Sequence, residues 1–273
     1  MRIETRLPHG TSYLLPILGG EVRLRLDVMP PAPIAFGPPM TDGPHPLLLL
    51  LDADLHYPVA AGLSRLLQVT GEVPPHWVVG LGFEGGEAID VYAERRIRYF
   101  SPWPIALPAP YPQNWVSGQG LRFRQALVEE VLPFIEATTQ AKRSAFNLIG
   151  VSLAGLFVTR LLRDAPTLFR GYGIISPRLG DQDRRMIREF DGLSAGWLPL
   201  DTRIVICAGD REDVPGTDLE SMTANAAELA GALQGLHGNV QHHVHPGETH
   251  ASVLGAALSR SIRALMALGE QPK

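Results

Sequence analysis

The chain has 273 residues, which is enough for one large α/β domain, and we predict a single domain over residues 1–273. Hydrophobic residues make up 45% of the chain and charged residues 19%, a balance typical of a globular protein rather than a disordered one. The formal net charge of −4 argues against binding to nucleic acid or to an anionic membrane, because both depend on an excess of Lys and Arg.

The N-terminal residues 1–20 contain one short apolar stretch, which Pro16 interrupts, so they make a poor signal peptide. The longest apolar run elsewhere, PLLLLLDA at 46–53, is far shorter than the roughly 20 residues that span a bilayer. These features predict a cytoplasmic protein with no membrane partner.

Short apolar runs alternate along the chain with longer segments in which apolar residues recur at spacings of three and four. The apolar runs predict strands at 21–28, 46–53, 77–83, 145–151, 172–177, 203–209 and 240–245. The longer segments predict helices near 56–69, 120–140, 153–164, 218–236 and 251–268. This alternation is typical of an α/β fold with a mostly parallel central sheet and helices on both faces.

Residues 101–118, SPWPIALPAPYPQNWVSG, do not fit this alternation, because five prolines interrupt any regular element. We interpret the segment as an ordered excursion over one end of the sheet. Its aromatic residues Trp103, Tyr111 and Trp115 would then form the wall of a substrate pocket. A surface connection anchored by the same side chains is the alternative.

Ser152 interrupts the apolar run NLIGVSLAGLFV at the point where a predicted strand becomes a predicted helix. The sequence from Gly150 to Ala154 is close to the G-x-S-x-G nucleophile elbow, a strained turn that presents a serine hydroxyl at the carboxyl end of a sheet. The fifth position is Ala154 instead of glycine, and a glycine follows at Gly155. Small residues are expected here because strand and helix approach closely. The alternative function of Ser152 is a helix N-cap.

A serine nucleophile requires a base, and His250 lies after the last predicted strand, at the start of the last predicted helix. This position fits the chain order Ser, acid, His of α/β-hydrolases, and a helix cap or surface residue is the alternative. The acid is expected in ICAGDREDVPG, where we prefer Glu212 over Asp213 and Asp210. A solvated turn is the alternative explanation of these three carboxylates.

Two other groups of reactive side chains do not indicate a cofactor. Cys207 is the only cysteine and lies in an apolar run, so a buried structural residue is expected. The pattern of His242, His243 and His245 puts two imidazoles on one strand face, but the sequence does not single out a third ligand. We therefore predict no metal and no cofactor.

Six blocks of sequence together resemble the α/β-hydrolase esterase family that includes esterase D, enterobactin-type siderophore esterases and mycolyltransferases. The blocks, which follow one another across residues 46–268, are LLLLDADLHYP, RIRYFSP, GVSLAGLF, FRGYGIISPRLG, AGDRE and GETHASVLGAALSRSIRAL. The resemblance implies an α/β-hydrolase fold with Ser152 as nucleophile, His250 as base and Glu212 as acid. It also implies an oxyanion hole formed by the backbone N–H groups of Leu153 and Asp54.

The resemblance implies a serine esterase that forms an acyl-enzyme on Ser152 and takes a small-molecule ester as its partner. Siderophore esterases often have D-G-D where this chain has DAD at 52–54, so the siderophore substrate itself stays open. An acyltransferase or thioesterase using the same residues is one alternative, and a non-catalytic binding domain is another. A homo-oligomer is compatible with this composition.

Three arginines suggest what the substrate carries. Arg98 and Arg178, together with Arg96, would attract an acidic or phenolic substituent if they face the pocket. The aromatic residues Trp103 and Trp115 would favour flat or apolar groups. The alternative is that all three arginines are surface residues that favour solubility.

Overall fold

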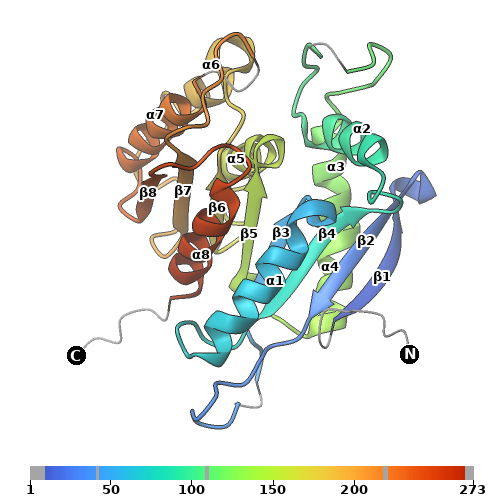
Figure 1. Ribbon diagram of the computed structural model, residues 1–273, viewed down its shortest axis with the longest axis vertical. Helices are drawn as coiled ribbons and strands as arrows, with labels where there is room; N and C mark the ends of the chain where they lie inside the picture. The colour runs from blue at the N-terminus through green and yellow to red at the C-terminus, as the bar shows by residue number, and fades with distance from the viewer. Residues whose placement is uncertain (1–9, 41–42, 108–110, 218–220, 268–273) are drawn as a thin grey trace.

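The computed structural model describes residues 10–40, 43–107, 111–217 and 221–267, and within these ranges the chain forms an eight-stranded sheet flanked by helices (Figure 1). The strand order is β1-β2-β4-β3-β5-β6-β7-β8. The strands are β1 (Thr11–Ile17), β2 (Val22–Met29), β3 (Leu47–Leu51), β4 (Trp77–Phe83), β5 (Phe146–Val151), β6 (Gly171–Ile175), β7 (Arg203–Gly209) and β8 (Val240–His245). All pairs from β4 to β8 are parallel, whereas β2 pairs antiparallel with both β1 and β4. The predicted α/β class with a mostly parallel sheet is confirmed.

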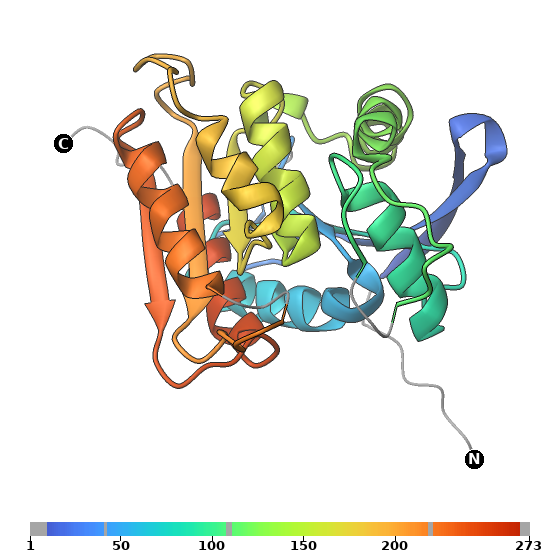
Figure 2. The same cartoon turned by 90° about the horizontal axis from the view of Figure 1, so that it is seen from above.

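Helices cover both faces of the sheet (Figure 2). One face carries α1 (Ala53–Val69) and α8 (Val253–Met266). The other face carries α5 (Leu153–Asp164), α7 (Met222–Gln234) and the continuous helical segment formed by α3 (Gly120–Ala126), a π-helical turn (Leu127–Val131) and α4 (Leu132–Thr139). Helices α2 (Ile89–Phe100) and α6 (Asp181–Arg188) lie at the end of the molecule where the parallel strands finish (Figure 1).

The central strands are buried on both faces, which explains their nearly continuous apolar sequence. Aromatic rings fill the layer between α2, α3 and α5, where Phe123 lies 5.5 Å from Phe100 and 5.6 Å from Phe157 between ring centroids. This packing fixes α2 against α5, the helix that follows Ser152. The N-terminal part of α2 is thereby held beside the carboxyl end of β5.

The seven predicted strands are all present, each to within two residues, whereas β1, α2 and α6 were not predicted from the sequence. Strand β1 is an edge strand paired only with β2, so it tolerates Pro16 and exposed residues. Helix α2 is rich in charged residues, which hides its apolar spacing. The predicted helices at 218–236 and 251–268 include residues 218–220 and 268, which lie outside the described ranges.

Residues 1–9 also lie outside the described ranges. They belong to the N-terminal stretch, residues 1–20, that the sequence predicts to be a poor signal peptide. Among the helices within those ranges, none has the length and apolar character needed to cross a membrane. The excursion at 101–118 is described except for 108–110, and it rises beyond the ends of the parallel strands beside α2 (Figure 1).

Candidate active site

Ser152 lies in a strained turn between β5 and α5. Its backbone angles, φ 58° and ψ −116°, belong to a region that residues other than glycine rarely adopt. The turn is held by hydrogen bonds: Ser152 N donates to Ile175 O (2.9 Å), and Ser152 O accepts from Leu156 N (3.0 Å) and Arg178 N (3.1 Å). The Ser152 side chain makes no capping hydrogen bond to α5, which argues against the alternative of a helix N-cap.

Two glycines explain the local sequence around this turn. A Cβ atom at Gly150 would lie 2.4 Å from Ala154 O, so only glycine allows α5 to start this close to β5. A Cβ atom at Gly155 would lie 3.1 Å from the Cα of Pro177 and 3.2 Å from Ile175 O. The second glycine stands one position after the usual motif because α5 packs there against the segment that follows β6.

His250 pairs with the carboxylate of Glu212. His250 lies in the connection between β8 and α8, and its Nδ1 is 3.0 Å from Glu212 Oε2. Glu212 is only 1% exposed, and its other oxygen, Oε1, accepts hydrogen bonds from Ser176 Oγ (2.6 Å) and from Gly209 N. A buried carboxylate with these donors can orient an imidazole so that its Nε2 is left to accept a proton.

The other two carboxylates of the same loop, those of Asp210 and Asp213, accept hydrogen bonds from backbone N–H groups. Asp210 Oδ1 accepts from Gly247 N (2.6 Å), and Asp213 Oδ1 accepts from Thr223 N (3.1 Å). Both aspartates are exposed, whereas Glu212 is buried. Within this described loop, Glu212 is the carboxylate that contacts His250.

Ser152 and His250 open onto one cavity of about 380 Å³. The residues that line it are Ile89, Tyr92, Ala93, Arg96, Ile97, Tyr111, Ser152, Leu153, Arg178 and His250. Leu153 is the first residue of α5, so its N–H has no acceptor within the helix and is available at this cavity. The cavity therefore combines a serine hydroxyl, an imidazole and a backbone donor.

A buried ion pair supports one wall of this cavity. Arg96 donates from Nη2 to Asp52 Oδ2 (2.8 Å) and from Nε to Asp52 Oδ1 (3.2 Å), and Asp52 is fully buried. The Arg96 guanidinium also lies 5.2 Å from the centroid of the Tyr92 ring. Burial raises the pKa of the Tyr92 phenol, which keeps it neutral at physiological pH. The wall thus combines an aromatic ring with a guanidinium whose charge Asp52 balances.

A scan against protein-family models finds no match. The sequence is 28% identical, over 93% of this chain and 92% of the relative, to the ferri-bacillibactin esterase BesA of Bacillus subtilis (strain 168). The chain has the α/β-hydrolase fold and is similar in sequence to this esterase. Among the solved structures that share this fold, two examples have low sequence identity to the chain. The BES protein from Bacillus cereus has a TM-score of 0.80 with 20% identity and 98% coverage of both chains. Siderophore hydrolase EstB from Aspergillus nidulans has a TM-score of 0.79 with 21% identity, covering 100% of this chain and 99% of that chain.

The structure corrects two of the predicted substrate contacts. Trp103 is only 6% exposed and belongs to the core, where it lines a separate cavity of about 130 Å³ and stacks under the guanidinium of Arg185 at 4.5 Å. Arg98 forms an ion pair with Glu94 at 2.6 Å, one turn earlier on α2. The sequence pattern alone does not reveal that α2 turns Arg96, instead of Arg98, toward the cavity.

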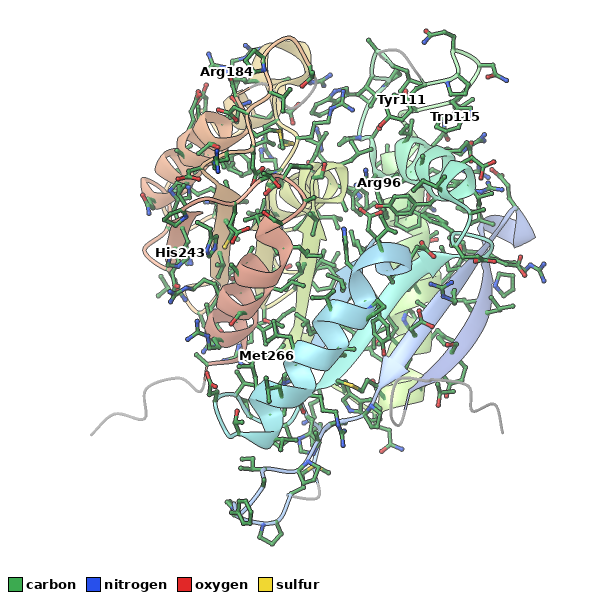
Figure 3. The ribbon with its side chains drawn as sticks, viewed as in Figure 1. Arg96, Tyr111, Trp115, Arg184, His243 and Met266 are labelled. Carbon is green, nitrogen blue, oxygen red and sulfur yellow. The ribbon has the colours of Figure 1, made fainter. Side chains whose placement is uncertain are left out.

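The other predicted wall residues lie closer to Ser152. Arg178 and Tyr111 line its cavity, and the ring of Trp115 is 6.0 Å from that of Tyr111. Figure 3 shows Tyr111 and Trp115 in the segment above Arg96, at the same end of the molecule. Trp115 therefore supports the wall through Tyr111. Of the three aromatic residues of the excursion, Tyr111 lines the pocket, Trp115 packs behind it and Trp103 lies in the core.

Asp54 faces away from Ser152. Its carboxylate accepts from Phe83 N (3.1 Å), pairs with Arg25 (3.1 Å) and lines a different cavity of about 510 Å³ beside β2. Desolvation by burial raises the pKa of this carboxyl group. The backbone N–H of Asp54 as an oxyanion donor stays a prediction.

The histidines of β8 and the single cysteine are partly or fully buried in the fold. Within the described ranges, no group of three or more His, Cys, Asp or Glu residues is arranged to hold a metal ion. Burial lowers the pKa values of His242, His243 and His245. Cys207 is buried as expected, and burial raises the pKa of its thiol to about 11, which disfavours the reactive thiolate.

Proposed function

We propose that the chain hydrolyses carboxylic esters through an acyl-enzyme on Ser152, with Ser152, His250 and Glu212 as a catalytic triad. The observation that carries this proposal is the hydrogen bond of 3.0 Å between His250 and the buried Glu212, next to a cavity that Ser152 also lines. The similarity to named siderophore esterases supports the same reaction class.

In the proposed reaction, Ser152 Oγ attacks the ester carbonyl carbon while His250 Nε2 accepts the hydroxyl proton. Glu212 orients the imidazole and stabilises its charged form. The N–H of Leu153, with that of Asp54 as the predicted second donor, stabilises the oxyanion. His250 then protonates the leaving alcohol as the ester C–O bond breaks. Water attacks the acyl-enzyme with His250 again acting as base, the bond from the acyl carbon to Ser152 Oγ breaks, and His250 returns the proton to Oγ as the acid product leaves.

We propose that the substrate is a siderophore-type ester that carries phenolic groups. Arg96, Arg178, Tyr92 and Tyr111 line the cavity, and arginines with aromatic rings recognise flat anionic groups by charge-assisted hydrogen bonds and stacking. The relative BesA is named for a ferri-bacillibactin substrate, which supports this class. A cytoplasmic location and a small-molecule ester partner remain predictions from the sequence.

The test of the mechanism is the Ser152→Ala variant, compared with Ser12→Ala in the other cavity as a matched control. The expected result is a loss in kcat on the order of 10³ or more in Ser152→Ala, with loss of fluorophosphonate labelling and an unchanged circular dichroism spectrum. Ser12→Ala should retain both activity and labelling. Labelling and turnover that survive in Ser152→Ala would remove this serine from the mechanism.

The test of the substrate class compares an ester of N-(2,3-dihydroxybenzoyl)serine with its 2,3-dimethoxy analogue, which lacks acidic hydroxyls. We expect kcat/KM to be about tenfold higher or more for the dihydroxy ester, because only its hydroxyls can form charge-assisted hydrogen bonds with arginine. Equal values would contradict the phenolic substrate. Product analysis with added alcohols would distinguish hydrolysis from acyl transfer.

A further inference from the structure

The segment from Ile175, the last residue of β6, to Arg178 contacts the two separate parts of the candidate site. Ile175 O accepts from Ser152 N (2.9 Å), and Arg178 N donates to Ser152 O (3.1 Å). Between them, Ser176 Oγ donates to Glu212 Oε1 at 2.6 Å. One short segment thus binds both the turn that carries the serine and the carboxylate that pairs with the histidine.

Ser176 is held in an unfavourable environment for a polar residue. It is fully buried, and its φ of 45° lies in the left-handed region that residues other than glycine rarely adopt. Its backbone N–H donates to Cys207 O (2.7 Å), which extends the pairing of β6 with β7 and fixes the residue in place. A side chain kept under such strain often has a functional role, and its hydroxyl reaches Glu212.

We propose that Ser176 is a positioning residue that fixes the Glu212 carboxylate so that one oxygen is held by the protein and the other is presented to His250. Oε1 takes the hydrogen bonds from Ser176 and Gly209, which leaves Oε2 for His250 Nδ1. This inference rests on the proposed function, because it assigns a role within the proposed triad.

The physical reason is that a carboxylate can rotate about its last side-chain bond unless donors fix it. With Ser176 removed, Gly209 N is the remaining donor to Oε1, and the buried carboxylate loses part of its compensation for desolvation. Glu212 would then sample orientations that do not hold the imidazole. The chemical step should slow, whereas substrate binding should change little, because Ser176 is not among the residues that line the cavity.

The experiment compares Ser176→Ala and Ser176→Gly with Ser101→Ala in the full chain. Both Ser176 variants remove the hydroxyl, but glycine also relieves the positive φ, so it separates the hydroxyl from the backbone conformation. Ser101 is the matched control, because it is equally buried and its Oγ donates to Ile97 O (2.7 Å) without contact to Glu212. The substrate is a chromogenic aryl ester.

We expect kcat to fall about 10- to 100-fold in both Ser176 variants with KM within about twofold of the wild-type value, and Ser101→Ala to keep its kcat. Ser176→Cys, whose S–H is a weak donor, should recover part of the loss. The downfield NMR resonance of the His250 Nδ1 proton should broaden or shift in the Ala and Gly variants, which a purely structural role would not cause.

Three results would overturn the inference in distinguishable ways. An inactive Ser152→Ala together with fully active Ser176→Ala and Ser176→Gly would overturn the role of Ser176 alone. Turnover retained in Ser152→Ala would overturn the proposed function and this role with it. Full activity in Ser176→Gly with a loss in Ser176→Ala would assign the effect to backbone strain and likewise contradict the role of the hydroxyl.

Discussion

Two aspartates at the start of helix α1, Asp52 and Asp54, pair with arginines that line two different cavities. Asp52 precedes the helix with a left-handed φ of 56° and binds Arg96 at the wall of the Ser152 cavity. Asp54 lies in the first turn, where its carboxylate pairs with Arg25 beside the antiparallel strand β2. Two carboxylates only two residues apart in the same strand-to-helix connection therefore bind different arginines, Arg96 and Arg25.

The larger of these two cavities is not the one that contains the reactive side chains. The Asp54 cavity is the larger one, at about 510 Å³ against about 380 Å³ for the Ser152 cavity. Among the described residues that line the larger cavity there is no histidine, and its arginine faces two aspartates. The smaller cavity brings a strained serine and a carboxylate-bound histidine together. The arrangement of groups, and not the volume, identifies the candidate site.

The largest expected effect is on kcat, in variants of the proposed triad compared with a variant in the larger cavity. We expect His250→Ala to lower kcat on the order of 10³ or more, as Ser152→Ala does, because triad members act as a unit. Glu212→Gln should lower kcat less, about 10²-fold, because the acid orients the imidazole and does not itself transfer the proton. Asp27→Asn, in the larger cavity, should leave kcat unchanged. Steady-state ester hydrolysis measures all three. A greater loss in Asp213→Asn than in Glu212→Gln would show that the acid is misassigned.

The two tryptophans of the excursion should differ in the property that they control. Trp103→Ala should lower the free energy of unfolding by about 3–5 kcal/mol, because it removes a buried ring from the core. It should leave the ratio of kcat/KM between aryl and acetate esters unchanged. Trp115→Ala should lower that ratio severalfold by loosening Tyr111. Urea denaturation and paired kinetics test this, and a changed ratio in Trp103→Ala would return that residue to the pocket.

An effect smaller than the loss of stability in Trp103→Ala is expected on the choice of substrate. Arg178→Gln should lower kcat/KM about tenfold for a phenolic ester relative to its methoxylated analogue, because one charge-assisted hydrogen bond is lost at the Ser152 cavity. Arg25→Gln, in the other cavity, should leave this ratio unchanged. A similar decrease in both variants would mean that long-range charge, rather than contact, sets the preference.

The smallest expected effect concerns pH and the larger cavity. Burial raises the pKa of Asp54, so the folded protein keeps this proton at a pH where the unfolded chain has released it. Rising pH through this window therefore lowers the wild-type free energy of unfolding relative to Asp54→Asn, whose amide does not titrate. Urea denaturation of both proteins from pH 4 to pH 7 measures the difference. A constant difference across this range would contradict the raised pKa.

The sequence by itself determined the main elements of the fold and the order of the reactive residues. Runs such as LLLLL at 47–51 have few alternatives to a buried parallel strand, and the turn at Ser152 is encoded by small residues next to it. His250 and Glu212 could be expected because each follows a strand whose carboxyl end meets the same edge of a parallel sheet. These features depend on neighbours close in the chain or on the general topology of the fold.

Only the tertiary structure decided which side chains share the cavity. The bond from Arg96 to Asp52 joins residues 44 positions apart, and that from Ser176 to Glu212 joins residues 36 positions apart. Such contacts depend on how α2 and the end of β6 pack against their neighbours, and local sequence patterns do not encode that packing. For the same reason, Trp103 was expected in the pocket and lies in the core, since burial is a property of the assembled layers and not of a single residue.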